Sequence, residues 1–251
     1  MNQTNAAERH TAAAVAESKI CLALDDLSAE RAIELTSKLW PWIYAAKIHD
    51  LYDAEGPNII KELKKAGAKR VWVDAKLHDT KDTVALRTRA LVRNGARIIT
   101  VHASGGIPMM KAAVEAANSE CGDVLAVIWA ITVLTSLDPG EIEDIYGWGF
   151  GREPKQIVFE FAHMAKEAGA RGLVCSAQEV GFLSAHPDLA GMKFTVPGTR
   201  SAGVALGQQK RSGTLAKAIA DGATYLVAGS QVTKASDPVA AFTTFEAEID
   251  T

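Results

Sequence analysis

The sequence has few cysteines and no long run of uncharged apolar residues. Its three cysteines, Cys21, Cys121 and Cys175, are odd in number, and their spacings match no zinc-binding or redox motif. Each lies in or beside an apolar run, so we expect buried free thiols and a protein of the reducing cytoplasm. No run of about 18 uncharged apolar residues occurs, so no membrane span is expected.

The sequence also lacks a strong excess of charge of either sign. The net charge is −3 at pH 7, the pI is about 6.1, and Lys and Arg form no long basic run. This balance gives no indication of a nucleic-acid or membrane partner, and a small anionic ligand would need local basic residues. Residues 1–17 lack the basic start and apolar core of a signal peptide. We expect them to form an N-terminal extension ahead of one domain at residues 18–251.

Short apolar runs alternate along the chain with longer amphipathic segments. Hydrophobic residues make up 48% and charged residues 23%, which is typical of a soluble globular enzyme. The apolar runs predict strands at Ile20–Asp25, Ile43–Ile48, Arg70–Lys76, Arg97–His102, Val124–Val133, Gly172–Cys175, Lys193–Pro197 and Thr224–Gly229. The amphipathic segments predict helices at Ser28–Leu39, Pro57–Ala66, Lys81–Arg93, Pro108–Ala117, Glu153–Ala168 and Arg211–Ala220.

Many of the helical segments end in glycine just before the next strand. Gly67, Gly95, Gly169 and Gly222 occupy this position, which is the preferred place for glycine after a helix. Eight strand–helix units in 251 residues predict a single α/β domain, a (β/α)₈ TIM barrel. An open doubly wound sheet is the alternative.

The active site of such a barrel lies at the C-terminal ends of its strands. Charged, polar or conformationally special residues stand at these predicted ends, where a strand interior would be apolar. They are Asp25, Lys47, Asp74, Lys76, His102, Thr135, Ser176, Pro197, Gly198, Gly229 and Ser230.

The segment from Asp74 to Asp79 carries the strongest chemical signal. Side chains alternate along a strand, so Asp74 and Lys76 are predicted to point the same way. Asp79 follows where the chain turns into the next helix, and Lys47 adds a cation from another strand. An alternating Lys–Asp–Lys–Asp array is expected.

Such an array suits a decarboxylation. Loss of CO₂ from an unactivated carbon leaves a carbanion, which a nearby ammonium can stabilise and then protonate. No metal or organic cofactor is required, and the sequence offers no obvious site for one. The simpler interpretation of an isolated D-x-K-x-x-D is a structural ion pair, with Asp79 capping the following helix.

Two further motifs are candidates for substrate binding. His102 ends a strand ahead of a Gly-rich turn, and we expect this residue to position rather than transfer a proton. Thr195–Arg200, with Ser201–Gln209 after it, follows the seventh strand, where this fold commonly binds phosphate. An ordinary rim histidine and an ordinary surface loop are the alternative interpretations.

At this point the sequence resembles the orotidine 5′-monophosphate decarboxylase family. The matching pieces occur in family order between about residues 20 and 240, and as a set they are highly specific. They are LALD (22–25), AAKI (45–48), EGP (55–57), DAKLHDTKDTV (74–84), VHASGGIPMMKAA (101–113), ITVLTS (131–136), VCSAQEV (174–180), PGTR (197–200) and SDP (236–238).

The resemblance implies a homodimeric, cofactor-free enzyme that converts orotidine 5′-monophosphate to UMP. It implies that Lys76 donates the proton, that Asp74 faces the substrate carboxylate, and that Lys47 bridges Asp74 and the ribose. Asp79 and Thr83 are implied to reach into the neighbouring subunit's site. The resemblance further implies that Asp25 binds the ribose hydroxyls, that Thr135 lies against the pyrimidine, and that Pro197, Gly198 and Gln209 belong to the closing loop.

The sequence departs from the family pattern where the phosphate is bound. The family has Gly-Arg-Pro after the eighth strand, but here Gly229 is followed by Ser230 and Gln231. Arg200, Arg211 or Lys81 would have to compensate. Further departures are Lys47-Ile48-His49 for Lys-Val-Gly, Thr80-Lys81-Asp82-Thr83 for Ile-Pro-Asn-Thr, and Gly213-Thr214 for Thr-Pro.

These departures leave several functions open. The first is orotidine 5′-monophosphate decarboxylation with a rearranged phosphate site. The second is a paralogous decarboxylase whose substrate has an altered or absent phosphate, which Ser230 motivates. The metal-dependent sugar-phosphate branch of the superfamily is disfavoured because it has an acidic residue where this chain has Lys47. A non-catalytic nucleotide-binding barrel is disfavoured because gathered charges are costly without a use.

Overall fold

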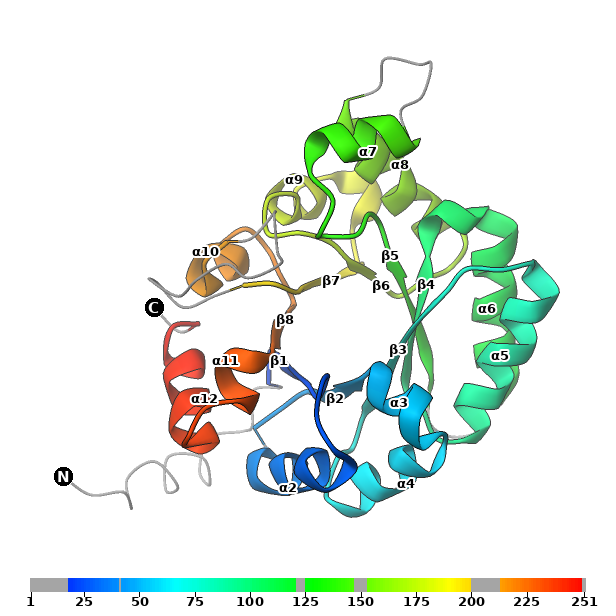
Figure 1. Ribbon diagram of the computed structural model, residues 1–251. Coiled ribbons are helices and arrows are strands. Elements are labelled where there is room, and N and C mark those ends of the chain that lie inside the picture. The colour runs from blue at the N-terminus through cyan, green and yellow to red at the C-terminus, as the bar shows by residue number, and fades with distance from the viewer. Residues whose placement is uncertain (1–17, 41, 121–124, 147–152, 200–212, 250–251) are drawn as a thin grey trace.

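Eight parallel strands close into a barrel, with helices around the outside (Figure 1). The computed structural model describes residues 18–40, 42–120, 125–146, 153–199 and 213–249. Neighbouring strands follow sequence order, and β8 pairs with β1 to close the ring. The strands are β1 (Ile20–Ala23), β2 (Ala45–Ile48), β3 (Val71–Leu77), β4 (Ile98–His102), β5 (Val127–Ile131), β6 (Gly172–Val174), β7 (Lys193–Val196) and β8 (Tyr225–Ala228). The predicted TIM barrel is confirmed.

Helices follow the strands and cover the outer face of the barrel (Figure 1). Ser28, Thr80, Thr214 and Asp237 cap four of them, each accepting a backbone N–H with its side chain. The α-helices are α2 (Ala29–Leu39), α3 (Asp50–Glu55), α4 (Asn58–Lys65), α5 (Lys81–Arg93), α6 (Gly106–Glu120), α7 (Pro139–Tyr146), α8 (Pro154–Glu167), α9 (Val180–Ser184), α10 (Leu215–Ala220), α11 (Ser230–Thr233) and α12 (Pro238–Ala247). Short 3₁₀ turns lie at Ala103–Gly105 and Pro187–Leu189.

The barrel has separate inner and outer apolar layers because its strands are buried on both faces. Side chains such as Leu22 and Ile60 fill the outer layer between strands and helices. The inner layer is aromatic: the Trp72 and Trp129 rings lie 4.9 Å apart edge to face, and Trp129 stacks on Tyr225 at 5.5 Å. These rings fill the barrel interior, so the barrel is a packed core rather than a pore.

Some predictions differ in detail from the structure. Thr80, not Asp79, caps α5: Thr80 Oγ1 accepts the Thr83 N–H, while Asp79 Oδ1 accepts the Thr80 N–H. A residue one position closer to the helix has the better reach to its first free donors. The helix predicted at Pro108–Ala117 is longer, because α6 runs from Gly106 to Glu120.

Other expectations are met or lie outside the described residues. Gly67, Gly95, Gly169 and Gly222 follow helices, as predicted, and each has a positive φ. Cys21 and Cys175 are buried thiols, and burial raises the pKa of the Cys21 thiol. Cys121 and the extension at residues 1–17 lie outside the described residues. Within the described ranges, none of the helices combines the length and apolar character needed to cross a bilayer.

Gly172 tests the packing of the inner aromatic layer. A Cβ at Gly172 would lie 2.7 Å from Trp129 Cδ1 and 3.0 Å from the Lys193 carbonyl oxygen. We expect Gly172→Ala to lower the free energy of unfolding by about 1–3 kcal/mol in urea titrations, because the Trp129 ring must shift. Gly140→Ala is the matched control, since its Cβ would meet only Asp138 Oδ1 at 3.4 Å. Equal stability of both variants and the wild type would contradict this account of the core.

Candidate active site

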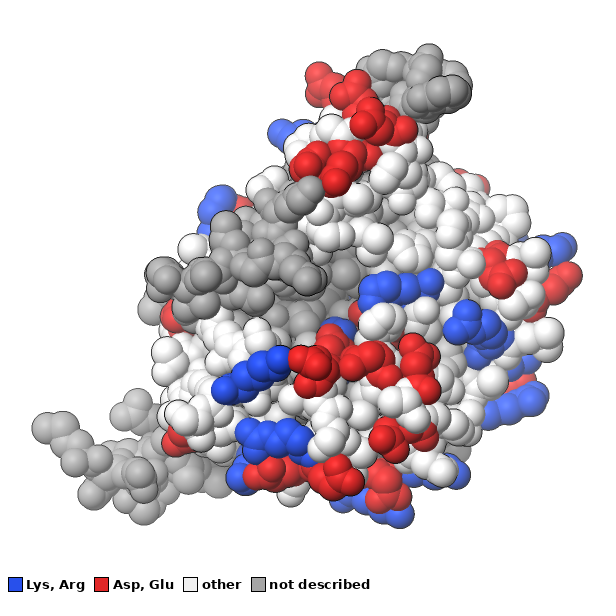
Figure 2. Space-filling model, in the orientation of Figure 1, with Lys and Arg blue, Asp and Glu red and all other residues white. Residues whose placement is uncertain are grey.

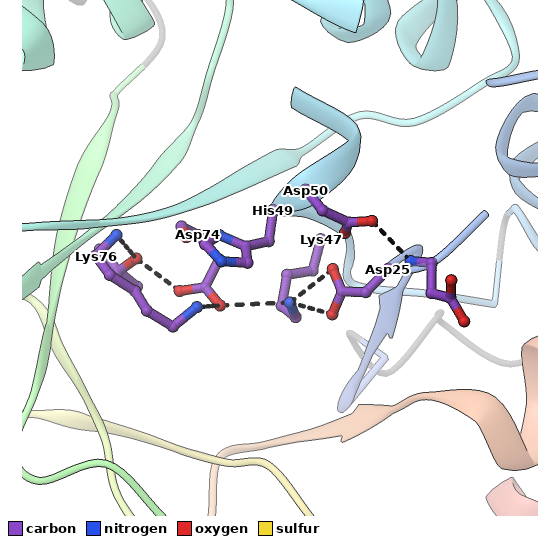
Figure 3. A network of polar contacts seen from close by, with 8 residues as sticks. Asp25, Lys47, His49, Asp50, Asp74 and Lys76 are labelled. Atoms are coloured by element: carbon purple, nitrogen blue, oxygen red, sulfur yellow. Dashed lines mark hydrogen bonds and ion pairs between the residues drawn. The ribbon is translucent and has the colours of Figure 1, made fainter. Parts of the chain in front are cut away.

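Four charged side chains from three neighbouring strands meet at one end of the barrel (Figure 3). Asp25 follows β1, Lys47 lies on β2, and Asp74 and Lys76 lie on β3. The parallel pairing of Ala23 with Lys47 and of Lys47 with Trp72 aligns the strand ends. Polar residues near the carboxyl ends of successive strands therefore share one mouth.

The four side chains form a continuous chain of ion pairs. Lys47 Nζ lies 2.7 Å from Asp25 Oδ2 and 3.3 Å from Asp74 Oδ2. Lys76 Nζ lies 2.7 Å from the same Asp74 oxygen. One carboxylate oxygen therefore accepts from two ammonium groups (Figure 3).

A cavity of about 310 Å³ opens beside these ion pairs. Its apolar floor belongs to the inner layer of the barrel and includes Trp72, Ile131, Val174 and Val227. Predicted site residues that line the cavity are Asp25, Lys47, Asp74, Lys76, Thr135, Pro197, Gly198 and Gly229. A small ligand in this cavity would contact charges on one side and apolar surface beneath.

The electrostatics of the cluster favour the charged forms of Asp74 and Lys47. Burial alone would raise the pKa of the Asp74 carboxyl, but Lys47, Lys76 and the hydrogen bonds from Lys76 and Thr100 lower it to about 2. Burial likewise opposes the charge of Lys47, but Asp74 and Asp25 outweigh it and raise the Lys47 pKa. Only 6% of Lys47 is exposed, so its charge depends on these two carboxylates.

The strand that carries Asp74 and Lys76 is irregular between them. Its pairing with β4 shifts between Val73 and Leu77, so three β3 residues lie opposite one residue of β4. Lys76 has a φ of 46°, in the left-handed region that non-glycine residues rarely adopt. The contact between Lys76 and Asp74 therefore does not arise from regular strand alternation, although alternation predicted it.

Thr100 is a buried site residue that the sequence analysis missed. Its Oγ1 donates to Asp74 Oδ1 at 2.7 Å and accepts the Lys76 N–H at 3.1 Å. Thr100 thus contacts both ends of the irregular segment. A polar side chain inside the apolar run of β4 was the available signal, because a fully buried hydroxyl needs a hydrogen-bond partner.

Three of the predicted site residues do not line the cavity of their own chain: Asp79, Thr83 and His102. Asp79 is exposed and Thr83 is partly exposed at the start of α5. The His102 ring, 5.7 Å from His78, is partly exposed at the end of β4, and burial, His78 and Lys76 lower its pKa. Within one chain, Lys47, Asp74 and Lys76 therefore lie together as predicted, but the fourth charged residue in contact with them is Asp25 and not Asp79.

The predicted phosphate-binding residues are only partly described. Ser230 is exposed at the first position of α11, directly after the cavity-lining Gly229. Lys81 is exposed and lines a different pocket, on the outer side of α5 and α6. Arg200, Gln209 and Arg211 lie outside the described residues. Acidic and basic side chains lie side by side on the face shown in Figure 2.

A closed parallel barrel with charged residues gathered at the carboxyl ends of its strands defines the class of (β/α)₈-barrel enzymes. Among the described residues, no cluster of three or more His, Cys, Asp or Glu is placed to hold a metal ion. The sequence model of the orotidine 5′-phosphate decarboxylase / HUMPS family matches residues 18–245. The chain belongs to this family.

Curated relatives and solved structures agree with this assignment. The chain is 38% identical over 236 residues to orotidine 5′-phosphate decarboxylase of Marinomonas sp., covering 93% of this chain and 97% of the relative. It is 39% identical over 241 residues to that of Moorella thermoacetica, covering 94% and 93%. The crystal structure of the Lactobacillus acidophilus orotidine 5′-phosphate decarboxylase superposes with a TM-score of 0.78 at 28% identity, covering 93% and 100%. The predicted enzyme class, a carboxy-lyase similar to these relatives, is confirmed.

Asp74→Asn tests the electrostatics of the cluster. The Asp74 pKa is lowered to about 2 from 3.8, so its carboxylate stabilises the fold above about pH 4 and loses this contribution as the pH falls through 2. We therefore expect the free energy of unfolding of the wild type to fall more between pH 6 and pH 3 than that of Asp74→Asn. The expected excess is about 1 kcal/mol in urea titrations at each pH. Parallel pH curves for the two proteins would contradict the assignment.

Proposed function

We propose that the protein converts orotidine 5′-phosphate to UMP and CO₂ without a cofactor, with Lys76 as the proton donor. The observation that carries this proposal is the Lys76 ammonium, held 2.7 Å from Asp74 beside a cavity with an apolar floor. The chain's membership of a decarboxylase family supports it. The proposed substrate is taken from the relatives that carry the name orotidine 5′-phosphate decarboxylase.

The proposed reaction uses the cluster in a defined order. The bond between the pyrimidine ring and its carboxylate breaks, CO₂ leaves, and the electron pair remains on the ring carbon. The Lys76 ammonium stabilises this pair and donates a proton to the same carbon, and the neutral amine then regains a proton from water. A unit charge pair about 4 Å apart contributes about 4 kcal/mol at an effective dielectric near 20.

The other cluster residues hold Lys76 and the substrate in place. Asp74 faces the substrate carboxylate and orients Lys76 through their ion pair. Lys47, pinned by Asp25 and Asp74, bridges the cluster to the ribose, and Asp25 binds ribose hydroxyls. Lys47 at the end of β2 favours this reaction over that of the sugar-phosphate branch. Thr135, Pro197, Gly198 and Gly229, which line the same cavity, contact the base and the phosphoribosyl group.

We also propose a homodimer with shared active sites. Asp79 and Thr83 lie outside their own chain's cavity at the start of α5. Their exposure leaves them available to a second copy, in which each would complete the partner's site. The buried thiols of Cys21 and Cys175 support a reducing compartment, and we place the protein in the cytoplasm.

A paralogous decarboxylase is the second candidate function. Ser230 directly follows the cavity-lining Gly229, at the position where the family has a phosphate-binding arginine. Loss of that charged contact removes binding energy that a phosphorylated substrate would use in the transition state. A substrate with an altered or absent phosphate would not need it. A nucleotide-binding barrel without catalysis is the third outcome that the same experiment tests.

Decarboxylation of orotidine 5′-phosphate and of orotidine separates these functions. We expect the wild type to decarboxylate the phosphate ester far faster than orotidine, measured by ultraviolet absorbance. Lys76→Gln is expected to lower kcat by roughly 10²–10⁴-fold, because it removes the proton donor. Ser230→Arg tests whether another residue already binds the phosphate. If one does, kcat/KM for the ester should change little in this variant.

Other results would redirect the assignment. Poor turnover of the ester by the wild type, with a large gain in Ser230→Arg or faster turnover of another carboxylated ligand, would favour the paralogue. Tight UMP binding with no turnover of either compound would favour the non-catalytic barrel. Unchanged activity in Lys76→Gln would exclude Lys76 as the donor.

Mixing two inactive variants tests the shared active site. Lys76→Gln and Asp79→Asn are each expected to be inactive, since they remove residues of the same composite site from different subunits. In a hybrid dimer, one site combines both substitutions and the other contains neither. Unfolding and refolding the variants together should therefore restore about a quarter of wild-type activity. Lys76→Gln mixed with Asp74→Asn is the control and should restore none, because both substitutions lie in the same half of each site.

A further inference from the structure

The segment Lys47–Asp50 at the end of β2 lies between β1 and β3 and contacts both (Figure 3). Lys47 pairs with Asp25 and Asp74. Asp50 Oδ2 accepts the Asp26 N–H at 3.0 Å, on the β1 side. His49 Nδ1 lies 2.8 Å from the carbonyl oxygen of Asp74, on the β3 side. The proposed reaction explains the ion pair between Lys47 and Asp74, but it does not explain the contact between His49 and the Asp74 carbonyl.

The Asp74 carbonyl lies where the regular pairing of β3 stops. The pairing of β2 with β3 ends at Ile48 and Val73. On the other side, the pairing of β3 with β4 shifts between Val73 and Leu77. A backbone carbonyl buried at such a point requires a donor from elsewhere. The His49 ring supplies that donor from the residue directly after β2.

The chemistry of this contact fixes the state of the ring. A carbonyl oxygen can only accept, so His49 Nδ1 must carry the hydrogen and donate it. The neutral ring is therefore the Nδ1–H tautomer, with Nε2 left as an acceptor. Protonation of Nε2 leaves the Nδ1–H bond intact. The contact thus holds the backbone in either charge state, which suits a positioning role.

We propose that His49 is a positioning residue that holds the main chain of Asp74, and through it the geometry of Asp74 and Lys76. Two fixed points then hold the irregular segment: His49 on the Asp74 carbonyl, and Thr100 on the Asp74 side chain and the Lys76 N–H. They hold Lys76 in its left-handed conformation. A misplacement of about 1 Å in such a cluster can cost about a hundredfold in rate.

Two substitutions of His49 separate the hydrogen bond from the bulk of the ring. In His49→Asn, the side-chain nitrogen can occupy the place of Nδ1, whereas His49→Leu has no donor. Because this test rests on the proposed function, kcat and KM for orotidine 5′-phosphate are the readouts. We expect His49→Leu to lower kcat about ten- to hundredfold with little change in KM. His49→Asn should restore kcat to within about threefold of the wild type.

Stability measurements and a control variant exclude a general packing effect. The thermal midpoint of each variant shows whether the loss in kcat follows stability. His186→Leu makes the same replacement at a histidine between α9 and β7, outside the cavity lining, and should leave kcat unchanged. Wild-type kcat in His49→Leu would overturn the proposal. An equal loss in His49→Asn and His49→Leu would overturn it as well, because the donor would then be irrelevant.

Nuclear magnetic resonance tests the same contact without any turnover. Nitrogen-15 shifts of the ring should show His49 as the Nδ1–H tautomer in the wild type, and an Nε2–H tautomer would overturn the proposal. The Ala75 and Lys76 amide resonances should move in His49→Leu and stay near their wild-type positions in His49→Asn. If the wild type does not decarboxylate orotidine 5′-phosphate but these spectra are as expected, the substrate assignment fails and the role of His49 stands.

Discussion

The rest of the site depends on the ion pairs between the buried Asp74 carboxylate and two ammonium groups inside the barrel mouth. An isolated carboxylate in this place would be costly, because burial removes it from water. Lys47, Lys76 and Thr100 each supply a hydrogen to its oxygens and reverse that cost. In turn, Asp74 and Asp25 outweigh the burial of Lys47 and raise its pKa. The two buried members of the cluster, Lys47 and Asp74, therefore each stabilise the charge of the other.

The barrel meets this requirement through its packing and through one local irregularity. The aromatic layer of Trp72, Trp129 and Tyr225 closes the interior beneath the cluster and keeps the local dielectric low. The shift in β3 then places Asp74 and Lys76 side by side at the edge of this layer. Residues in sparsely populated backbone regions persist when their surroundings fix them, and they concentrate at functional sites. The φ of Lys76 is such a case.

The sequence predicted the fold well because each strand–helix unit repeats the same local signals. Apolar runs and glycines after helices are properties of neighbouring residues, and they located all eight strands. The same reasoning found Lys47, Asp74 and Lys76 because charges at strand ends are conspicuous. It missed Thr100 and His49, whose importance comes from contacts across the irregular segment. The prediction assumed that side chains alternate regularly along β3, but the strand is irregular there and Lys76 has a left-handed backbone. The predicted contact between Asp74 and Lys76 is therefore present for a different geometric reason.

Asp79 shows a different limit of sequence reasoning. Proximity in sequence to Lys76 suggested one four-membered array, but the chain leaves β3 after Leu77, and Asp79 lies exposed in the connection to α5. No pattern within one chain states which copy of the chain a side chain will contact. Ser230, which stands where the family has an arginine, likewise leaves the sequence without a statement of which residue binds the phosphate. The charged cluster is built from β1–β3, whereas Gly229 and Ser230 follow β8. Because different strands supply these parts, substrate recognition can change while the decarboxylating cluster is retained. The cluster therefore constrains the reaction more tightly than it constrains the substrate.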